Sequence, residues 1–333
     1  MVTIRDIARQ AGVSVATVSR TLSEPDAVRA ETRARVQEAV AAMNYTPNAI
    51  ARQLRRQRKE TIIVIVPDIS NPFFSGIVKG IENLAHDMGY RVLLGETQGK
   101  QERLDYYADL VLTRIADGLI LLGSLLPTMV QASVAAGQAP SIPLVLACER
   151  FDGLQCPTVG IDNVAAARMA VMHLVQRGCS KIATITGPAD NSLSLDRAQG
   201  YREVLAAAGL PIDGAMMGEG DFTIESGFAA MNLLLDKGLG VDGVFCANDE
   251  MAIGAQQAVL SRGLRVPQDV AVIGFDDIRF GAFAYPPLST IRQPVGDLGE
   301  AAMRALDEVL HKKPTEQQSV ILPHELVVRG STA

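Results

Sequence analysis

The stretch TIRDIARQAGVSVATVSRTL occupies residues 3–22 and predicts two short helices joined by a tight turn. Its first apolar residues recur at i, i+3, i+4 and i+7, the spacing of one buried helical stripe: Ile4, Ile7, Ala8 and Ala11. Gly12 follows the stripe and suits the left-handed turn that ends a helix. Ser14 can then cap a second helix that runs to Leu22.

A third helix is predicted after Pro25, where apolar residues again share one helical face: Val36, Ala39, Val40 and Met43. Two helices joined by a glycine turn and supported by a third form a helix-turn-helix, in which the second helix enters the major groove of DNA. Residues 1–46 are therefore predicted to be a small all-α DNA-binding headpiece.

The outer face of the second helix is the predicted base-reading surface. Val18 and Leu22 are expected to point inward, which leaves four outward residues: Val15, Ala16, Ser19 and Arg20. Val15 and Ala16 offer only apolar contact, for example to a thymine methyl group, whereas the Arg20 guanidinium can donate two hydrogen bonds to guanine.

Four hydroxyl residues are interpreted as phosphate contacts or helix caps: Thr3, Ser14, Thr17 and Ser19. For Thr17, a hydrogen bond at the start of the helix is an equal alternative.

Charge is unevenly distributed along the chain. Residues 1–59 contain 11 Lys and Arg against 5 Asp and Glu, and the whole-chain totals of 31 and 37 leave 20 against 32 for the rest. Ten of the eleven basic residues are Arg, whose planar guanidinium suits phosphates and guanine. The basic segment predicts double-stranded DNA as a partner.

From Thr61 onward the chain alternates short apolar runs with helical patterns. The runs occupy 61–66, 118–122, 143–147, 181–186, 243–247 and 270–274. Continuous apolar strands are typical of parallel sheets covered by helices on both faces, so a doubly wound α/β body is predicted. Its length favours two sheets of five or six strands, with a switch near residues 158–163.

Ligands of open parallel sheets bind beyond the carboxyl ends of the strands. The segments that follow the apolar runs hold polar and aromatic residues: 68–74, 123–124, 148–150, 162–163, 187–197, 248–249 and 276–277. Carboxylates and amides there can bond ligand hydroxyls, Arg197 can anchor the ligand, and Phe73, Phe74 or Phe222 can stack on an apolar face. A small hydroxyl-bearing ligand is predicted.

Several function classes are disfavoured. The sequence contains no nucleophile elbow, no phosphate-binding glycine loop, and no Cys or His pair at metal-ligand spacing, so no enzyme, cofactor or metal site is expected. Apolar runs stay well short of the roughly 20 residues that cross a bilayer, and residues 1–10 lack the apolar segment of a signal peptide. We expect a cytoplasmic protein with no membrane contact.

Residues 3–22, together with ETRARVQEAVAAMNYTPNAIARQLR at 31–55, resemble the N-terminal module of LacI/GalR-family transcription regulators. The resemblance implies base reading by Val15 and Ala16, with Arg20 further along the same face. It also implies that NAIARQL at 48–54 is a hinge helix within a 47–60 linker, with DNA contacts from Asn48, Ala51 and Leu54.

The implied role of Leu54 is an apolar wedge in the minor groove, and packing on the protein core is the alternative. Such a short helix is not stable alone in water, so a dimer partner and DNA are expected to order it.

The body resembles the effector domain of the same family, which is similar to periplasmic sugar-binding proteins. Three of the matching stretches are DISNPFFSGIVKGIE at 68–82, GVFCANDEMAIGA at 243–255 and VAVIGFDDI at 270–278. The implied effector contacts are Phe73, Phe74, Ser124, Arg197, Phe222, Asn248 and Asp276. For single members a structural role is the alternative: a hydrophobic staple for the phenylalanines, a turn for Asn248, and a loop cap for Asp276.

Within the family, this body is most similar to cytidine-responsive members, which implies a nucleoside effector. Cys148 and Asn191 also occupy effector positions. Cys148 stands where cytidine-responsive and purine-responsive members carry a polar side chain, and Asn191 and Leu193 stand where purine-responsive members use donors to the base. A sugar or sugar acid therefore stays open as the alternative effector.

The predicted organisation is a headpiece (1–46), a hinge and linker (47–60) and an effector-binding and dimerisation domain (61–333). The latter is expected to have an N-lobe of about 61–160 with 291–321, and a C-lobe of about 161–290 with 322–333. The predicted function is a homodimeric, sequence-specific repressor controlled by a small polar effector. A solute-binding protein without a DNA function is the less favoured alternative.

Overall fold

The structure, a computed structural model, describes residues 2–23, 25–45, 60–151, 153–312 and 319–333. The chain divides into two compact units, Met1–Lys59 and Glu60–Ala333. Among the residues described, no helix is both long enough and apolar enough to cross a membrane.

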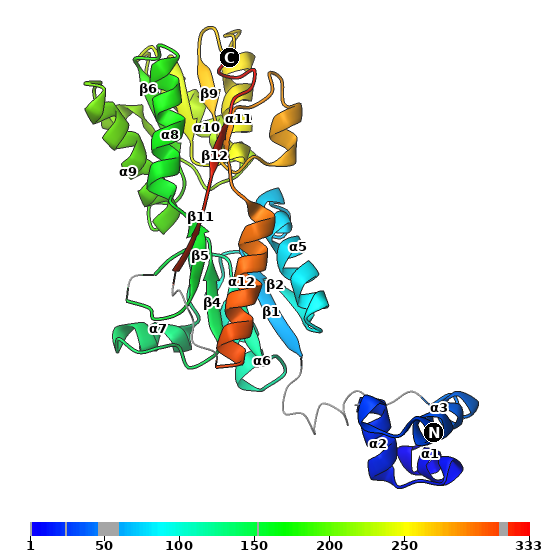
Figure 1. Cartoon of the computed structure of the whole chain (residues 1–333). Coiled ribbons are helices and arrows are strands. Elements are labelled where there is room, and N and C mark those ends of the chain that lie inside the picture. Colours follow the sequence, from blue (N-terminus) through cyan, green and yellow to red (C-terminus); the bar gives the residue numbers. More distant parts are fainter. Residues whose placement is uncertain (1, 24, 46–59, 152, 313–318) are drawn as a thin grey trace. The chain divides into compact units, whose positions relative to one another are not determined.

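The first unit is a three-helix headpiece, as predicted (Figure 1). It contains α1 (Ile4–Ala11), α2 (Val15–Ser23), the 3-10 turn η1 (Pro25–Ala27) and α3 (Ala30–Ala42). Its small core is centred on Ile7, Val18 and Val36, one from each helix and each fully buried.

Polar contacts fix the angle between α1 and α2. Gly12 ends α1 at φ +62°, a conformation that a Cβ atom would strain. The Ser14 hydroxyl then caps α2 by accepting from the Thr17 backbone N–H at 3.1 Å. From α3, the Arg35 guanidinium donates to the carbonyls of Ala11 and Gly12, which stabilises the turn.

The N-lobe of the second unit is built on a six-stranded parallel sheet. Its strands, in spatial order, are β11 (Ser319–Leu322), β5 (Thr158–Ile161), β4 (Leu144–Ala147), β3 (Gly118–Leu121), β1 (Thr61–Val66) and β2 (Arg91–Glu96). Helices α5 (Pro72–Asp87) and α12 (Val295–Leu310) share a core with Ile62 and Val64, whereas α6 (Gln101–Leu112) and α7 (Thr128–Ala135) share one with Ile63 and Ile65. Successive residues of β1 thus point to opposite faces of the sheet, and helices cover both faces. This explains the continuous apolar sequence of β1.

The C-lobe repeats this plan with a four-stranded parallel sheet. The strands, in order, are β7 (Met217–Glu219), β6 (Ile182–Thr186), β8 (Gly243–Cys246) and β9 (Ala271–Ile273). Helices α8 (Asn163–Gln176) and α9 (Ser192–Ala207) cover one face, and α10 (Ile224–Asp236) and α11 (Asp249–Ser261) cover the other. The short 3-10 turns are η2 (Gly214–Met216) and η3 (Arg279–Phe283).

The chain passes between the lobes at three places. The first passage joins β5 to α8, the second joins β10 (Thr290–Arg292) to α12, and the third joins β11 to β12 (Glu325–Val327). Figure 1 shows β11 and β12 running as one extended segment from the N-lobe sheet into the C-lobe. Strands β10 and β12 pair antiparallel, so two of the passages lie side by side.

The doubly wound fold is as predicted, but the strand count of the second sheet was wrong. It has four parallel strands rather than five or six, because β10 and β12 form a separate antiparallel pair. The sequence patterns also missed β2 and β7, whose exposed or half-buried residues interrupt the apolar runs.

Candidate functional site

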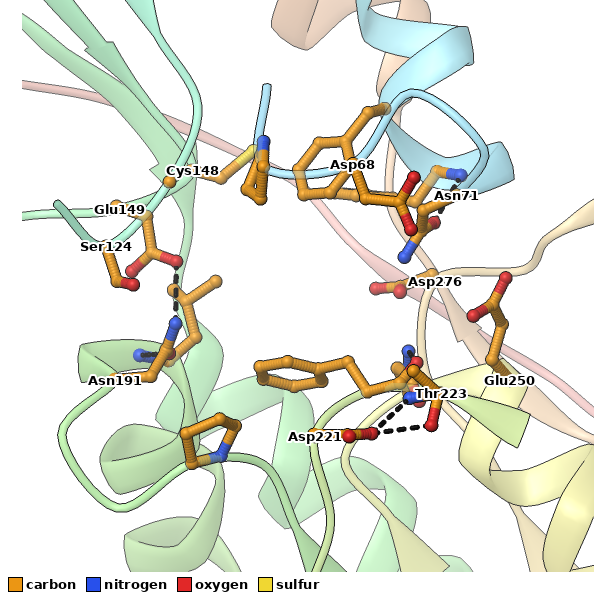
Figure 2. A pocket seen from close by; sticks show the side chains of 18 of the residues that line it. Asp68, Asn71, Ser124, Cys148, Glu149, Asn191, Asp221, Thr223, Glu250 and Asp276 are labelled. Carbon is orange, nitrogen blue, oxygen red and sulfur yellow. Dashed lines mark hydrogen bonds between the residues drawn. The ribbon is translucent and has the colours of Figure 1, made fainter. Parts of the chain in front are cut away.

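A cavity of about 300 Å³ opens between the two lobes of the second unit (Figure 2). Its walls come from the loops at the carboxyl ends of strands in both sheets, the position expected for a ligand of parallel sheets. All nine residues predicted to contact an effector line it: Phe73, Phe74, Ser124, Cys148, Asn191, Arg197, Phe222, Asn248 and Asp276. The structure therefore brings them together in one place.

Aromatic rings supply the apolar wall. Phe73 and Phe74, at the start of α5, meet edge to face with their ring centroids 5.4 Å apart. Phe222 comes from the C-lobe and has the left-handed φ of +70°. Its carbonyl accepts a 2.9 Å hydrogen bond from the Asn248 side-chain amide, which holds the strained residue in place.

Arg197 is the buried cation of the site. Its Nε donates to Asn163 Oδ1 at 3.0 Å and its Nη1 donates to the carbonyl of Ala247. The guanidinium also stacks 3.7 Å above the centre of the Phe275 ring. These contacts fix the orientation of the charge before any ligand enters.

Asp276 lies 4.0 Å from Arg197 and is also buried. It accepts a 2.7 Å hydrogen bond from Gln293 Nε2, and its backbone has a φ of +112°. Burial raises the pKa of the Asp276 carboxyl to about 6, although the charge of Arg197 opposes this. The carboxylate is thus a strong acceptor held at a strained position.

Four helices begin at the cavity, and a residue that lines it caps each one. The N-caps of α5, α9, α10 and α11 are Asn71, Asn191, Thr223 and Asn248. Each cap side chain accepts from the first turn of its own helix, so a structural role exists beside any ligand contact. For Asn248, the alternative of a turn residue is therefore realised as a helix cap.

Four carboxyl residues of the cavity were not selected from the sequence: Asp68, Glu149, Asp221 and Glu250. Asp68 and Glu149 do lie in the strand-end segments that the sequence points to, which was the available signal. In the pair Asp249–Glu250, the strand-end segment predicted from the sequence includes Asp249, but Glu250 is the residue that lines the cavity.

Asp249 and Asp277 have structural roles instead. Asp249 is fully buried and accepts from the Thr290 hydroxyl at 2.6 Å and the Ile278 N–H at 2.8 Å. Asp277 pairs with Arg292 and Arg329. Both carboxylates therefore hold the segments near the second passage between the lobes.

Direct contacts join the lobes at one end of the cavity. Glu149 of the N-lobe accepts from Asn191 Nδ2 and from the Ser192 hydroxyl of the C-lobe, each at 2.9 Å. Next to it, Arg150 forms a two-point ion pair with Asp196 of α9. Figure 2 shows the Glu149–Asn191 bond at the side of the cavity that also holds Ser124 and Cys148.

Cys148 has a left-handed φ of +73°, and burial raises the pKa of its thiol, which keeps it neutral. A neutral thiol is a poor nucleophile and a poor metal ligand. Within the described parts of the chain, no three His, Cys, Asp or Glu residues are placed to hold a metal ion.

The headpiece presents the other predicted site. Ala16 and Arg20 of α2 are exposed and Ser19 is half-buried, but Val15 packs partly against the core and is less outward than expected. Thr3 forms a capping box with Asp6, and Thr17 bonds Ser14, so both have a structural role at helix starts. Asn48, Ala51 and Leu54 lie outside the described residues.

Comparison with known proteins finds matches for both the headpiece and the effector-binding unit. A family model for bacterial regulatory proteins of the lacI family matches residues 3–48, and one for a periplasmic binding protein-like domain matches residues 171–332. The HTH-type transcriptional repressor CytR of Escherichia coli K12 is 42% identical over 330 residues, covering 99% of this chain and 96% of the relative. The chain belongs to the LacI family.

Other LacI-family proteins match over the same length. The ribose operon repressor of Escherichia coli K12 is 36% identical over 332 residues, covering 99% of this chain and all of the relative. The structure of the lac repressor dimer bound to operator and the anti-inducer ONPF superposes with a TM-score of 0.88, at 30% identity and 99% coverage of both chains. The complex of the regulator CelR with cellobiose gives a TM-score of 0.74, at 35% identity, covering 99% of this chain and 100% of that one.

Membership of the LacI family makes the chain a DNA-binding transcriptional repressor with an effector-binding domain, and not an enzyme. The resemblance inferred from the sequence is thereby confirmed.

The carboxyl groups of the cavity lead to a prediction about stability. Burial, and then the charges of Asp68 and Asp276, raise the pKa of Glu250 to about 7 from an ordinary 4.5. Between these values the folded state binds more protons than the unfolded state, so the free energy of unfolding falls as the pH rises. Glu250→Gln removes this loss and should stabilise the protein by roughly 1–2 kcal/mol near neutral to mildly alkaline pH.

Urea unfolding followed by circular dichroism measures the effect, and the gain should shrink towards about pH 5. The control is Glu219→Gln on the exposed strand β7. A gain that is equal at both pH values would contradict the raised pKa.

Proposed function

We propose that this repressor is a homodimer whose operator affinity is controlled by a nucleoside, with cytidine favoured. The observation that carries the proposal is the convergence of nine separately predicted residues on one cavity between two lobes. A sugar or a sugar acid is the alternative effector within the same class of regulator.

The shape and chemistry of the cavity support a nucleoside. Phe73 and Phe222 provide rings on which a base can stack, and Asp276, Arg197 and Asn248 provide acceptors and donors for ribose hydroxyls. The volume of about 300 Å³ is at the lower end of the usual range for small-ligand pockets, which suits one small molecule. The likeness to CytR points the same way, whereas the CelR complex holds the sugar cellobiose.

Gln293 offers a route from effector to DNA. Its side chain bonds Asp276 in the cavity, and its backbone lies in the passage between β10 and α12. A ligand that binds Asp276 therefore acts on a segment joining the lobes. A ligand shifts such an equilibrium only by its difference in affinity for the two lobe arrangements, typically 1–3 kcal/mol or roughly 5- to 150-fold.

In the proposed mechanism, lobe movement alters the hinge at 47–60, where Leu54 inserts in the minor groove and Asn48 and Ala51 contact DNA. The headpiece reads bases with Ala16 and Arg20, and the exposed part of the Val15 side chain adds an apolar contact to the bases. The hydroxyl groups of Thr3, Ser14, Thr17 and Ser19 bind phosphates, which positions the headpiece on the duplex without reading bases.

Exposed apolar residues mark the proposed dimer surface. On the N-lobe they are Ile69, Met88, Leu93 and Leu94, and on the C-lobe they are Phe280, Phe283 and Tyr285. The sequence predicts a dimer surface formed by the first helix of the body, residues 74–88, and by the segment after Pro287. In that segment residues 288–291 are fully buried within the chain and cannot face a partner. The exposed aromatic residues lie just before that segment.

The first prediction from the proposed function concerns base reading. Arg20→Ala should weaken specific operator binding by about 10- to 100-fold, because one forked contact to guanine is lost, while non-specific binding changes much less. Gel shifts on promoter fragments measure this, with Arg202→Ala, at an exposed position of α9, as the control. Unchanged operator affinity of Arg20→Ala would refute the role of Arg20.

The second prediction concerns the effector. Saturating cytidine should raise the melting temperature, since a ligand at about 100 times its Kd adds about 2.7 kcal/mol of stability. Asp276→Asn should abolish the shift while keeping the fold, because Asn tolerates the left-handed backbone. Asp236→Asn, on the exposed end of α10, is the matched control. A shift that survives in Asp276→Asn would remove this residue from the site.

The third prediction concerns assembly. Sedimentation should give twice the chain mass of 35.5 kDa, and the pair Phe283→Asp with Tyr285→Asp should shift the protein towards monomers. Leu112→Asp, an equally apolar exposed site on α6, serves as the control and should stay dimeric. A monomeric parent protein would refute the proposed dimer.

A further inference from the structure

Negative charge dominates the cavity between the lobes. Among the described residues that line it, five carry carboxyl groups and one carries a positive charge. The acidic residues are Asp68, Glu149, Asp221, Glu250 and Asp276, and the basic residue is Arg197.

The single guanidinium is already engaged by the protein. Two of its nitrogens donate to Asn163 and Ala247, its face covers Phe275, and its remaining side is turned to Asp276. An anionic ligand would have to share this charge with a buried carboxylate of the protein.

Helix N-termini supply further positive potential, but not enough to reverse the sign. Four helices begin at the cavity, and each terminus is equivalent to about half a positive charge. Together with Arg197 they supply about three positive charges, against five carboxyl groups of which Glu250, with a pKa raised to about 7, is about half protonated near neutral pH. Their first-turn N–H groups are also occupied by the cap side chains of Asn71, Asn191, Thr223 and Asn248.

The excess negative charge is concentrated at one end of the cavity. Asp68 of the N-lobe and Asp276 of the C-lobe both act on Glu250, and together with burial they raise its pKa. Figure 2 shows these three carboxyl groups on the side opposite Ser124, Glu149 and Asn191. Asp68 belongs to the N-lobe and Glu250 to the C-lobe, so both lobes contribute acidic side chains to this end of the cavity.

We infer that this effector site selects by charge: it takes an uncharged or cationic ligand with hydroxyl or amino donors and rejects the same ligand when it carries a carboxylate or phosphate. Donors can bond the carboxylates of Asp68, Glu250 and Asp276, whereas an added anion is repelled by them in a partly desolvated space. The inference rests on the proposed function, and it removes sugar acids and nucleotides from the candidate effectors.

Ligand pairs of equal size test the inference on the full-length repressor. The pairs are cytidine 5′-carboxamide with cytidine 5′-carboxylate, and D-glucuronamide with D-glucuronate, titrated by calorimetry near neutral pH. The neutral member should bind at least about 30-fold more tightly, because a single added charge near several carboxylates is costly at low effective dielectric. Equal or tighter binding of the acid in either pair would overturn the inference.

A double variant tests whether the carboxylates cause the selection. Asp68→Asn with Glu250→Gln should reduce the ratio of the two affinities within a pair by at least about tenfold. Glu219→Gln with Asp236→Asn, both exposed and outside the cavity, should leave the ratio unchanged. An undiminished ratio in the first variant would assign the selection to shape and reject the role given to these side chains.

The outcomes also separate this inference from the proposed function. Binding of glucuronamide but of no nucleoside would refute cytidine and retain charge selection. A repressor whose best ligand is a nucleotide or a sugar acid would refute charge selection and leave its binding to DNA untouched.

Discussion

The buried guanidinium of Arg197 constrains much of the effector-binding unit. A desolvated charge is tolerated only when hydrogen bonds and an opposite charge surround it, and here those partners come from separate elements of the C-lobe. Asn163 begins α8, Ala247 follows β8, Phe275 follows β9, and Asp276 connects through Gln293 to the passage into α12. One side chain on α9 thus connects two strand ends, one helix start and a lobe connection into a single wall, which is formed without a ligand.

The sequence could predict the ligand-contacting positions because of a simple regularity. Buried parallel strands appear in the sequence as apolar runs, and their carboxyl ends lie at one edge of a sheet. The residues after Val66, Leu122 and Ala147 therefore meet at the edge of the N-lobe sheet and those after Ala247 lie at the edge of the C-lobe sheet, and the cavity lies between these two edges. The sequence could not show which acidic residue of the pair Asp249–Glu250 lines the cavity. Asp249 faces inward to Thr290 and Ile278 whereas Glu250 lines the cavity, a difference of one residue at the start of a helix. Strands β2 and β7 were missed because their apolar stretches are short: three residues, 92–94, in β2 and Met217 alone in β7.

Strain and charge accumulate at the same place. Cys148, Phe222 and Asp276 line the cavity with left-handed backbones that non-glycine residues seldom adopt. Such conformations persist only where the surroundings hold them, and here the hydrogen bond from Asn248 to Phe222 and that from Gln293 to Asp276 do so. The strained residues and like charges of the cavity therefore lower the stability of the protein without ligand. A ligand that relieves this repulsion has a large effect on the arrangement of the lobes.

The threefold passage of the chain between the lobes also dictates how the protein is completed during synthesis. The N-lobe sheet lacks its edge strand β11, and its face lacks the cover of α12, until residues beyond the whole C-lobe sheet have left the ribosome. Nascent chains consequently carry an apolar sheet face that only α5 covers for most of translation, and neither lobe is complete before the other. Truncation from the C-terminal end removes parts of both lobes, so shortened products lose the whole effector-binding unit and do not retain one intact lobe.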